Sequence, residues 1–314
     1  MANDLTPGEV GAAAASSDMK GEPGNVVQSC PKVTLEIGVF FDGTLNNAAN
    51  SRASVSLGGS FDNAVTNVKL LEEIYYDKKQ DTRNSCGSYA RRYYGHYVPG
   101  IGTISGQEDD KKGYRWGTGD TGIEERVYKA AIDVGGLIRK LGGGIEPEEV
   151  ILDVFGFSRG AAAARYFVNG FNAGELRIDD WGRDRVAVLP EGRKIRIRFL
   201  GVFDTVAAVG LPSNDNNGDV NVHLKPSSAD TIYHLTAGDE FRDSFCLNHN
   251  IRGGGETMQL PGVHSNIGGG GTRIAMMNPL WWSVRKKCYG HLARQRKKLW
   301  QKPKRAKPRL RLPM

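Results

Sequence analysis

The sequence predicts an α/β fold, an α/β-hydrolase-like three-layer sandwich with a mostly parallel central sheet. Short runs rich in β-branched and aromatic residues alternate with helically spaced apolar residues, as parallel strands alternate with crossover helices. Near the centre, the apolar run EVILDVF leads into GFSRG, and the small-residue stretch AAAARYF follows. With 39% hydrophobic and 25% charged residues over 314 positions, the chain can bury one sizeable core.

The elements follow from local spacing and from turn residues. Short apolar runs predict strands over residues 32–41, 93–98, 149–155, 194–203 and 258–263. Helical spacing predicts helices over residues 63–76, 123–141, 161–167 and 229–247. Polar composition predicts a surface insertion and a loop over residues 107–121 and 210–228.

Charge divides the chain into three parts. Residues 1–30, rich in Ala, Gly, Ser and Pro, predict a flexible leader before a catalytic domain at 31–271. A basic tail follows at 272–314. Residues 271–314 hold 14 Lys and Arg and no acid, which leaves 28 basic and 35 acidic residues before them. Residues 1–270 therefore carry −7 and the tail +14, so the basic balance of the whole chain comes from the tail, and we expect no nucleic-acid binding by the domain.

Several classes of protein are excluded by what the sequence lacks. No run approaches the roughly 20 apolar residues that a membrane-spanning helix needs. Residues 1–29 lack the basic start and apolar block of a signal peptide. The four cysteines are widely spaced and form no C-x-x-C pair, so we expect free thiols in a reduced compartment, and no metal and no cofactor.

The pentapeptide Gly156-Phe157-Ser158-Arg159-Gly160 matches G-x-S-x-G, the nucleophile elbow of serine hydrolases. At a sharp turn from strand to helix, the serine takes a strained conformation, and glycines on either side remove clashes. The helix N-terminus places partial positive charge beneath the serine, and the Arg159 N–H can face a developing oxyanion. We therefore interpret Ser158 as a nucleophile rather than a helix cap.

A serine nucleophile needs an acid and a base later in the chain. Asp204 is the best acid, because it ends the strand RIRFLGVF where the sheet edge should carry Ser158. Asp153 lies inside a strand and is interpreted as a partly buried, locally bonded acid. Asp239 and Asp243 fall in the expected helix 229–247 and should be solvated.

Among the histidines after Asp204, His264 is the best base. It follows the last expected strand and precedes a run of glycines, where this architecture delivers its histidine. His223 and His249 lie in polar loops and His234 on an expected helix, so each is given a surface or capping role.

The second oxyanion donor is expected from the turn Asp42-Gly43-Thr44, through the N–H of either Gly43 or Thr44. Asp42 is expected to brace this turn by short side-chain hydrogen bonds. The same FFDGTL segment suggests a magnesium-dependent haloacid-dehalogenase-like phosphatase. The nucleophilic aspartate of that class would stand where this chain has Phe40, which argues against the phosphatase.

Six ordered blocks over residues 32–270 resemble the catalytic domain of type VI secretion lipase effectors of the phospholipase A kind: GVFFDGTLNN, YYGHYVPGIGT, VFGFSRGAAAAR, FLGVFDTVAAVG, HLTAGDEFRDSF and LPGVHSNIGGG. The resemblance implies that Ser158, Asp204 and His264 are nucleophile, acid and base. It implies hydrolysis of membrane glycerophospholipids as an antibacterial activity. It also implies synthesis in the bacterial cytoplasm without a signal peptide, export on a secretion spike or adaptor to the periplasm or membrane of a target cell, and an immunity protein in the producer.

The chain departs from the family at two positions and in its continuation. Asn266 stands where members carry Asp, which weakens support of the loop, and Gly271 stands where an aromatic residue is common. The family sequence usually continues far beyond the glycines, where this chain turns into its basic tail.

Three interpretations of the tail stay open: a peripheral membrane anchor, a binding arm for a partner or nucleic acid, and a frameshifted or truncated end. The alternative to an active lipase is therefore a catalytically impaired remnant, or a protein that binds membranes or partners through residues 272–314.

Overall fold

The computed structural model describes residues 33–75, 81–83, 87, 89–142, 147–179, 184–188, 195–210, 220–250 and 253–271, all within the unit Pro31–Met314. The leader and the tail expected from the sequence lie outside these residues. The strands are β1 (Thr34–Phe41), β2 (Thr82–Arg83), β3 (Tyr89–Val98), β4 (Glu149–Phe157), β5 (Glu175–Asp179), β6 (Asp184–Val188), β7 (Ile195–Phe203), β8 (Thr231–Ala237) and β9 (Glu256–Leu260). The helices are α1 (Ala48–Ser51), α2 (Asn67–Tyr75), α3 (Lys111–Trp116), α4 (Ile123–Leu141), α5 (Arg159–Ala173) and α6 (His264–Gly268), with 3₁₀ turns η1 (Gly59–Phe61) and η3 (Asp243–Phe245).

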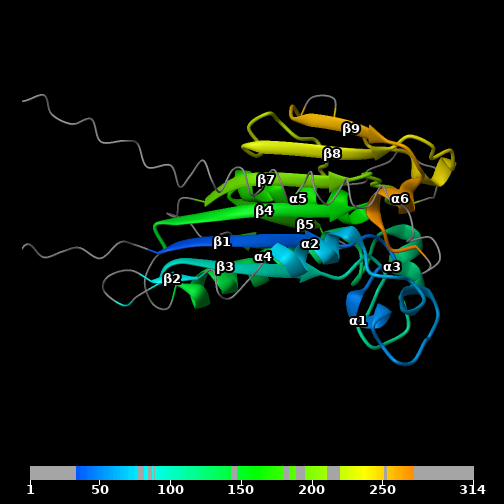
Figure 1. The fold of residues 1–314 in the computed structure, drawn as a ribbon, viewed down its shortest axis with the longest axis horizontal. Coiled ribbons are helices and arrows are strands. Elements are labelled where there is room, and N and C mark those ends of the chain that lie inside the picture. Colours follow the sequence, from blue (N-terminus) through cyan, green and yellow to red (C-terminus); the bar gives the residue numbers. More distant parts are fainter. Residues whose placement is uncertain are drawn as a thin grey trace, which may run out of the picture. The chain divides into compact units, whose positions relative to one another are not determined.

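Seven strands form the central sheet in the order β2-β3-β1-β4-β7-β8-β9 (Figure 1). Every neighbouring pair is parallel except β2 with β3. Strands β5 and β6 form a separate antiparallel pair. The mostly parallel α/β fold that the sequence predicts is confirmed.

Helices cover both faces of the sheet because its strands alternate apolar side chains between the two faces. From β1, the side chains of Leu35, Ile37 and Val39 enter the core beneath α4 and α5. Phe40 points the other way and packs with α2 and with Ile267 of α6. The helices on the two faces and the sheet between them make the three layers (Figure 1). One hydrophobic core lies on each face of the sheet.

The expected helix over residues 229–247 is wrong. The structure has strand β8 there, paired in parallel with β7 and β9, and then the turn η3. Thr231, Ile232 and Thr236 are β-branched and favour a strand, and the apolar residues that suggested a helix instead lie between two sheet neighbours.

The segment 107–121 is more than a polar insertion, because it contains helix α3. Asp110 caps the helix by accepting a hydrogen bond from the Lys112 N–H at 3.0 Å. Gly117 ends it with φ of 71°, a left-handed conformation that glycine adopts without strain. The polar composition of residues 107–121 therefore gave no sign of the short capped helix α3.

The carboxyl ends of the parallel strands gather the predicted site residues at one edge of the sheet. Asp42 follows β1, Ser158 follows β4, Asp204 follows β7, and His264 begins α6 shortly after β9. Parallel α/β sheets present their ligand-binding crevices at this edge. The topology thus assembles residues that lie up to 222 positions apart in the chain.

Candidate active site at the carboxyl edge of the sheet

Ser158 sits in a sharp turn between β4 and α5. Its φ of 56° and ψ of −126° lie outside the favoured regions for a residue with a side chain, and it is 6% exposed. The Ser158 N–H donates to Phe203 O at 3.0 Å, and its carbonyl accepts from Val206 N at 3.3 Å. The turn is therefore held from β7 in the strained conformation of a nucleophile elbow.

The elbow is possible only because its flanking residues are glycines. A Cβ on Gly160 would lie 2.2 Å from Asp42 O, and one on Gly156 would lie 2.3 Å from Gly160 O. Both are far below contact distance and involve backbone atoms, which cannot move aside cheaply. Side chains at these two positions would therefore clash with the backbone, which is the reason that the sequence analysis gives for the glycines.

Asp204 and His264 form a buried pair, with the Asp204 Oδ2 2.6 Å from the His264 Nδ1. The other Asp204 oxygen accepts from Ala237 N at 2.8 Å, which fixes the carboxylate. The two residues are 3% and 5% exposed. An acceptor held at Nδ1 selects the tautomer whose Nε2 is free to take a proton.

The imidazole of His264 is held between two aromatic rings. The ring centroid of Phe157 lies 4.6 Å from it and that of Phe245 lies 4.8 Å from it. Its Nε2 has no hydrogen-bond partner among the described residues. The His264 N–H donates to the Glu240 carboxylate at 3.1 Å, and hydrogen bonding from Arg242 lowers the pKa of Glu240 to about 2.

Ser158 and His264 open onto one cavity of about 520 Å³, which Thr44 and Arg159 also line. Among the described residues no hydrogen bond joins the Ser158 Oγ to the His264 Nε2. Such contacts are often long in ligand-free sites and tighten when substrate binds. Asp204 lies behind the histidine, away from the cavity, in the position of an orienting acid.

The turn after β1 distinguishes the two expected oxyanion donors. The Gly43 N–H donates to the side chain of Asp42 at 2.8 Å and is thus occupied. The Thr44 N–H donates to no acceptor among the described residues, and Thr44 lines the cavity. Arg159 is the first residue of α5, where a backbone N–H has no partner within the helix.

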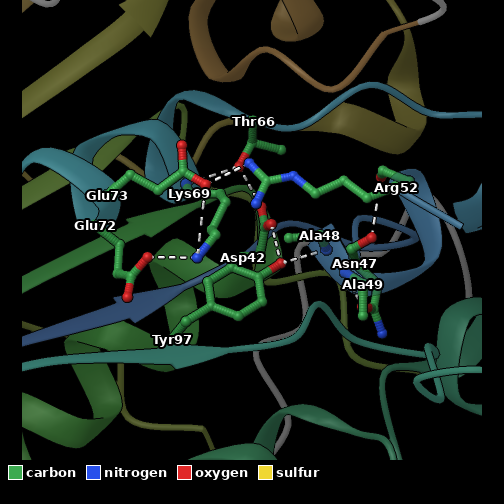
Figure 2. Close-up of polar contacts among 11 residues, drawn as sticks. Asp42, Asn47, Ala48, Ala49, Arg52, Thr66, Lys69, Glu72, Glu73 and Tyr97 are labelled. Carbon is green, nitrogen blue, oxygen red and sulfur yellow. Dashed lines mark hydrogen bonds and ion pairs between the residues drawn. The ribbon is translucent and has the colours of Figure 1, made fainter.

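Asp42 lies beneath this turn in a buried network (Figure 2). Its carboxylate accepts from the Tyr97 hydroxyl at 2.5 Å and from the Thr66 hydroxyl at 2.7 Å, besides the Gly43 N–H. Burial raises the pKa of Asp42 to about 6, against the lowering effect of these hydrogen bonds and of Lys69. Thr66 also forms a backbone bridge with Gly269, so the network joins the Asp42 turn to the end of α6.

Asn266 does not line the cavity but holds the loop that carries His264. The Asn266 side-chain Oδ1 accepts from Val263 N at 3.0 Å, and the Asn266 backbone N–H donates to Val263 O at 2.8 Å. The preceding Gly262 has φ of 111°, which a residue with a Cβ adopts only under strain. The side-chain oxygen of Asn266 thus accepts the same hydrogen bond from Val263 N that an aspartate carboxylate would accept.

Three acids differ from what the sequence suggested. Asp153 is fully buried rather than partly buried, and its partners are distant in sequence: Arg198 Nε at 2.9 Å and the Tyr75 hydroxyl at 2.8 Å. Asp239 is in a loop, not a helix, and accepts from Gly262 N at 2.6 Å. Asp243 begins the short 3₁₀ turn η3 rather than lying in the long helix expected over residues 229–247, and both Asp239 and Asp243 are exposed, as the sequence suggested.

The expected surface role of His234 is wrong as well. It lies on β8 with no exposed surface, its Nε2 accepting from Thr205 N at 3.4 Å and its Nδ1 3.3 Å from Arg165 Nη2. Burial lowers the pKa of His234 to about 3, so it supports the loop after Asp204 as a neutral ring. His223 and His249 are exposed, in agreement with the sequence interpretation.

Other site residues gave little sequence signal. Tyr97 lies on β3, Phe245 in η3, and Glu240 and Thr66 outside the named helices and strands, and tertiary packing brings all four to the site. No cluster of three His, Cys, Asp or Glu residues that could hold a metal occurs in the part of the chain that the structure describes. No described helix has the length and apolarity needed to cross a membrane.

Comparison with known proteins agrees with the resemblance carried by the motifs. Residues 183–286 match the family described as the type VI secretion phospholipase effector Tle1-like catalytic domain. The matched segment contains Asp204 and His264, whereas Ser158 precedes it. No curated protein matches the chain.

Two solved structures are similar to it. A Tle1 effector bound to the VgrG spike of the type VI secretion system is 30% identical, with a TM-score of 0.55 over 80% of this chain. An uncharacterized protein from Pseudomonas aeruginosa is 24% identical over 77% of this chain and 42% of its own length, with a TM-score of 0.44. The chain spans 53% of the Tle1 effector, about half of its length. The family resemblance that the sequence predicts is confirmed.

Proposed function

We propose that this chain, similar to the Tle1-like catalytic domain, is a serine-dependent carboxylic ester hydrolase that releases fatty acid from membrane glycerophospholipids. One observation carries the proposal. His264, whose Nδ1 lies 2.6 Å from the buried Asp204 carboxylate, lines the same cavity as a serine in a strained elbow. This combination activates a hydroxyl for attack on an acyl carbon.

In the proposed mechanism, the His264 Nε2 accepts the Ser158 hydroxyl proton as the Ser158 Oγ bonds to the ester carbon. The Asp204 carboxylate accepts the hydrogen bond from the Nδ1–H and stabilises the imidazolium. The carbonyl oxygen becomes an oxyanion, which the Arg159 and Thr44 N–H groups stabilise together with the N-terminus of α5. Collapse of this intermediate breaks the ester bond, and His264 returns its proton to the departing alcohol.

Water then completes the cycle. His264 takes a proton from water as the hydroxide oxygen bonds to the acyl carbon, and collapse of the second intermediate releases fatty acid and returns the proton to Ser158 Oγ. Asp42 and Gly43 hold the oxyanion turn, and Asn266 supports the histidine loop. Every step uses groups of this chain and water, so the proposal needs no metal and no cofactor.

Substrate and delivery follow from the resemblance. We propose phospholipid in the membrane of a competing bacterium as the substrate, and export by a type VI system to the target-cell periplasm. The similarity to a Tle1 effector bound to a VgrG spike supports a spike or adaptor protein as a partner. An immunity protein in the producing cell would complete this antibacterial role.

The test is fatty-acid release from phospholipid vesicles by the full chain and by Ser158→Ala. We expect the variant to lose activity by about 10⁴-fold or more, because the nucleophile is removed. Ser265→Ala is the matched control, since Ser265 lines the same cavity but lies outside the proposed triad. It should retain activity within about fivefold, as surface-type substitutions do. Full activity of Ser158→Ala would contradict the proposal.

A further inference from the structure

The wall of the cavity beside Ser158 has a charge opposite to that of the domain. Arg115, Arg159 and Arg242 line the cavity, and none of the described residues that line it is Asp or Glu. The chain before its tail nevertheless holds more acids than bases, 35 against 28. A positive concave site on an acidic domain attracts an anion toward the reacting serine.

Arg159 is a half-buried cation without a counter-ion. Its guanidinium donates to three neutral acceptors: Tyr114 O at 2.6 Å, Ala208 O at 3.1 Å and Thr44 Oγ1 at 3.4 Å. Among the described residues it forms no ion pair, and its Nη2 makes no hydrogen bond. Burial lowers the pKa of Arg159, which reflects the cost of holding this charge away from water. A bound anion would offset that cost.

Arg115, on α3, is a second free cation on this wall. It is exposed and makes no hydrogen bond or ion pair with the rest of the described chain. Arg242 differs, because Glu240 neutralises it at 2.7 Å and Phe245 covers its guanidinium at 3.9 Å. The free positive charge therefore lies on the side of the cavity formed by α3 and the start of α5.

We propose that Arg159 and Arg115 form a phosphate subsite that selects acyl esters carrying a phosphodiester beside the scissile bond. This inference rests on the proposed function. In a glycerophospholipid the acyl ester and the phosphate share one glycerol unit, so a phosphate-binding group must stand close to the nucleophile. Arg159 follows Ser158 in the chain, and its Nη2, which the hydrogen bonds of Nε and Nη1 leave available, can donate a charge-assisted hydrogen bond to a phosphate oxygen.

The experiment compares two substrates with the same acyl chains, phosphatidylglycerol and diacylglycerol, in micelles of one neutral detergent at fixed salt. We expect Arg115→Gln and Arg159→Gln to lower the ratio of kcat/KM for phosphatidylglycerol to that for diacylglycerol about tenfold, chiefly through KM. Arg159→Lys should keep part of the preference. Lys112→Gln removes one charge from the same helix outside the cavity and should leave both activities unchanged.

Equal losses on both substrates would show that the arginines only support the cavity walls, and would overturn the proposal. An unchanged ratio in both variants would overturn it as well. A second measurement is independent of turnover: titration of diethyl phosphate, a phosphodiester anion, into Ser158→Ala. Binding should weaken at least fivefold when Arg159→Gln is added, and equal binding would contradict the subsite. If no ester is hydrolysed but this binding difference is found, the proposed function fails while the anion site stands.

Discussion

The Asp204–His264 contact joins two distant parts of the chain at 2.6 Å. An aspartate accepts the Nδ1–H of the histidine, whereas an asparagine would present its amide and favour the wrong tautomer. We therefore expect Asp204→Asn to lower kcat by about 10³- to 10⁴-fold with little change in structure. Steady-state hydrolysis of a nitrophenyl ester, with circular dichroism for the fold, checks this.

The control is Asp243→Asn, which changes an exposed acid in η3, near Phe245, the ring that packs on His264. Its activity should equal that of the unmodified chain. Loss of activity in both variants, or in neither, would contradict the assigned role of Asp204.

The raised pKa of Asp42 predicts how the free energy of unfolding depends on pH. Its folded-state pKa of about 6 lies above the ordinary value of 3.8. The folded state therefore binds the proton more tightly than the unfolded state, and stability is lost as pH rises through this interval. The free energy of unfolding of the unmodified chain should fall by about 3 kcal/mol relative to that of Asp42→Asn between pH 3.5 and pH 7.

Urea unfolding of both chains across this range measures the difference. Comparing with Asp42→Asn removes the contributions of the histidines and other acids, because they titrate in both chains. A difference that does not vary with pH would show that Asp42 does not carry the shifted pKa.

At the scale of elements, the sequence predicts helices, strands and turns best where local residue chemistry decides the structure. The elbow, helix α4 and the turn after β1 depend on glycines and on regular spacing, and each was predicted close to its observed bounds. Strand β8 was not, because its apolar residues also fit a helix and only pairing with β7 and β9 decides between them. His234 was misplaced for the same reason.

Helix α5 approaches the turn after β1 so closely that Gly160 admits no side chain. A methyl group there would meet Asp42 O at 2.2 Å and push the turn after β1 away from the elbow. We expect Gly160→Ala to lower the free energy of unfolding by about 1–3 kcal/mol and to reduce kcat. Denaturant unfolding and ester hydrolysis measure both effects.

Gly136→Ala is the matched control. Gly136 lies within α4, and its added methyl would meet no atom within 4 Å. This substitution should stabilise the fold by about 0.5–1 kcal/mol and leave activity unchanged. Equal stability of the two variants would show that the close contact of α5 is not a constraint.

For the whole molecule, the candidate triad of Ser158, Asp204 and His264 could be proposed from sequence because the acid and base follow the elbow in the order that α/β-hydrolases use. The grouping of three arginines on the cavity wall could not be predicted from the sequence. Arg115, Arg159 and Arg242 come from three separate segments, and only the folded chain shows that one cavity collects them with no acid among its described lining residues.

The basic tail allows a test at this scale. Residues 287–314 follow the segment matched by the family and hold 11 Lys and Arg and no acid. Deleting them should reduce binding to anionic vesicles, since each cation near such a surface contributes about 1 kcal/mol. Hydrolysis of a soluble short-chain ester should stay within about twofold, because the proposed triad is untouched.

Vesicle sedimentation and ester turnover, measured on the same preparations, separate the two roles. Ester turnover that disappears with the tail would contradict a catalytic site confined to residues 31–271. Unchanged vesicle binding would exclude the tail as the membrane anchor.

Covalent labelling tests the central claim most directly. A fluorophosphonate reacts with a serine only when a base activates its hydroxyl, so the site of the adduct identifies the nucleophile. Peptide mass spectrometry of the labelled full chain should find the adduct on Ser158, and His264→Ala should abolish it. An adduct on another residue, or none on a preparation that hydrolyses esters, would contradict the proposed triad.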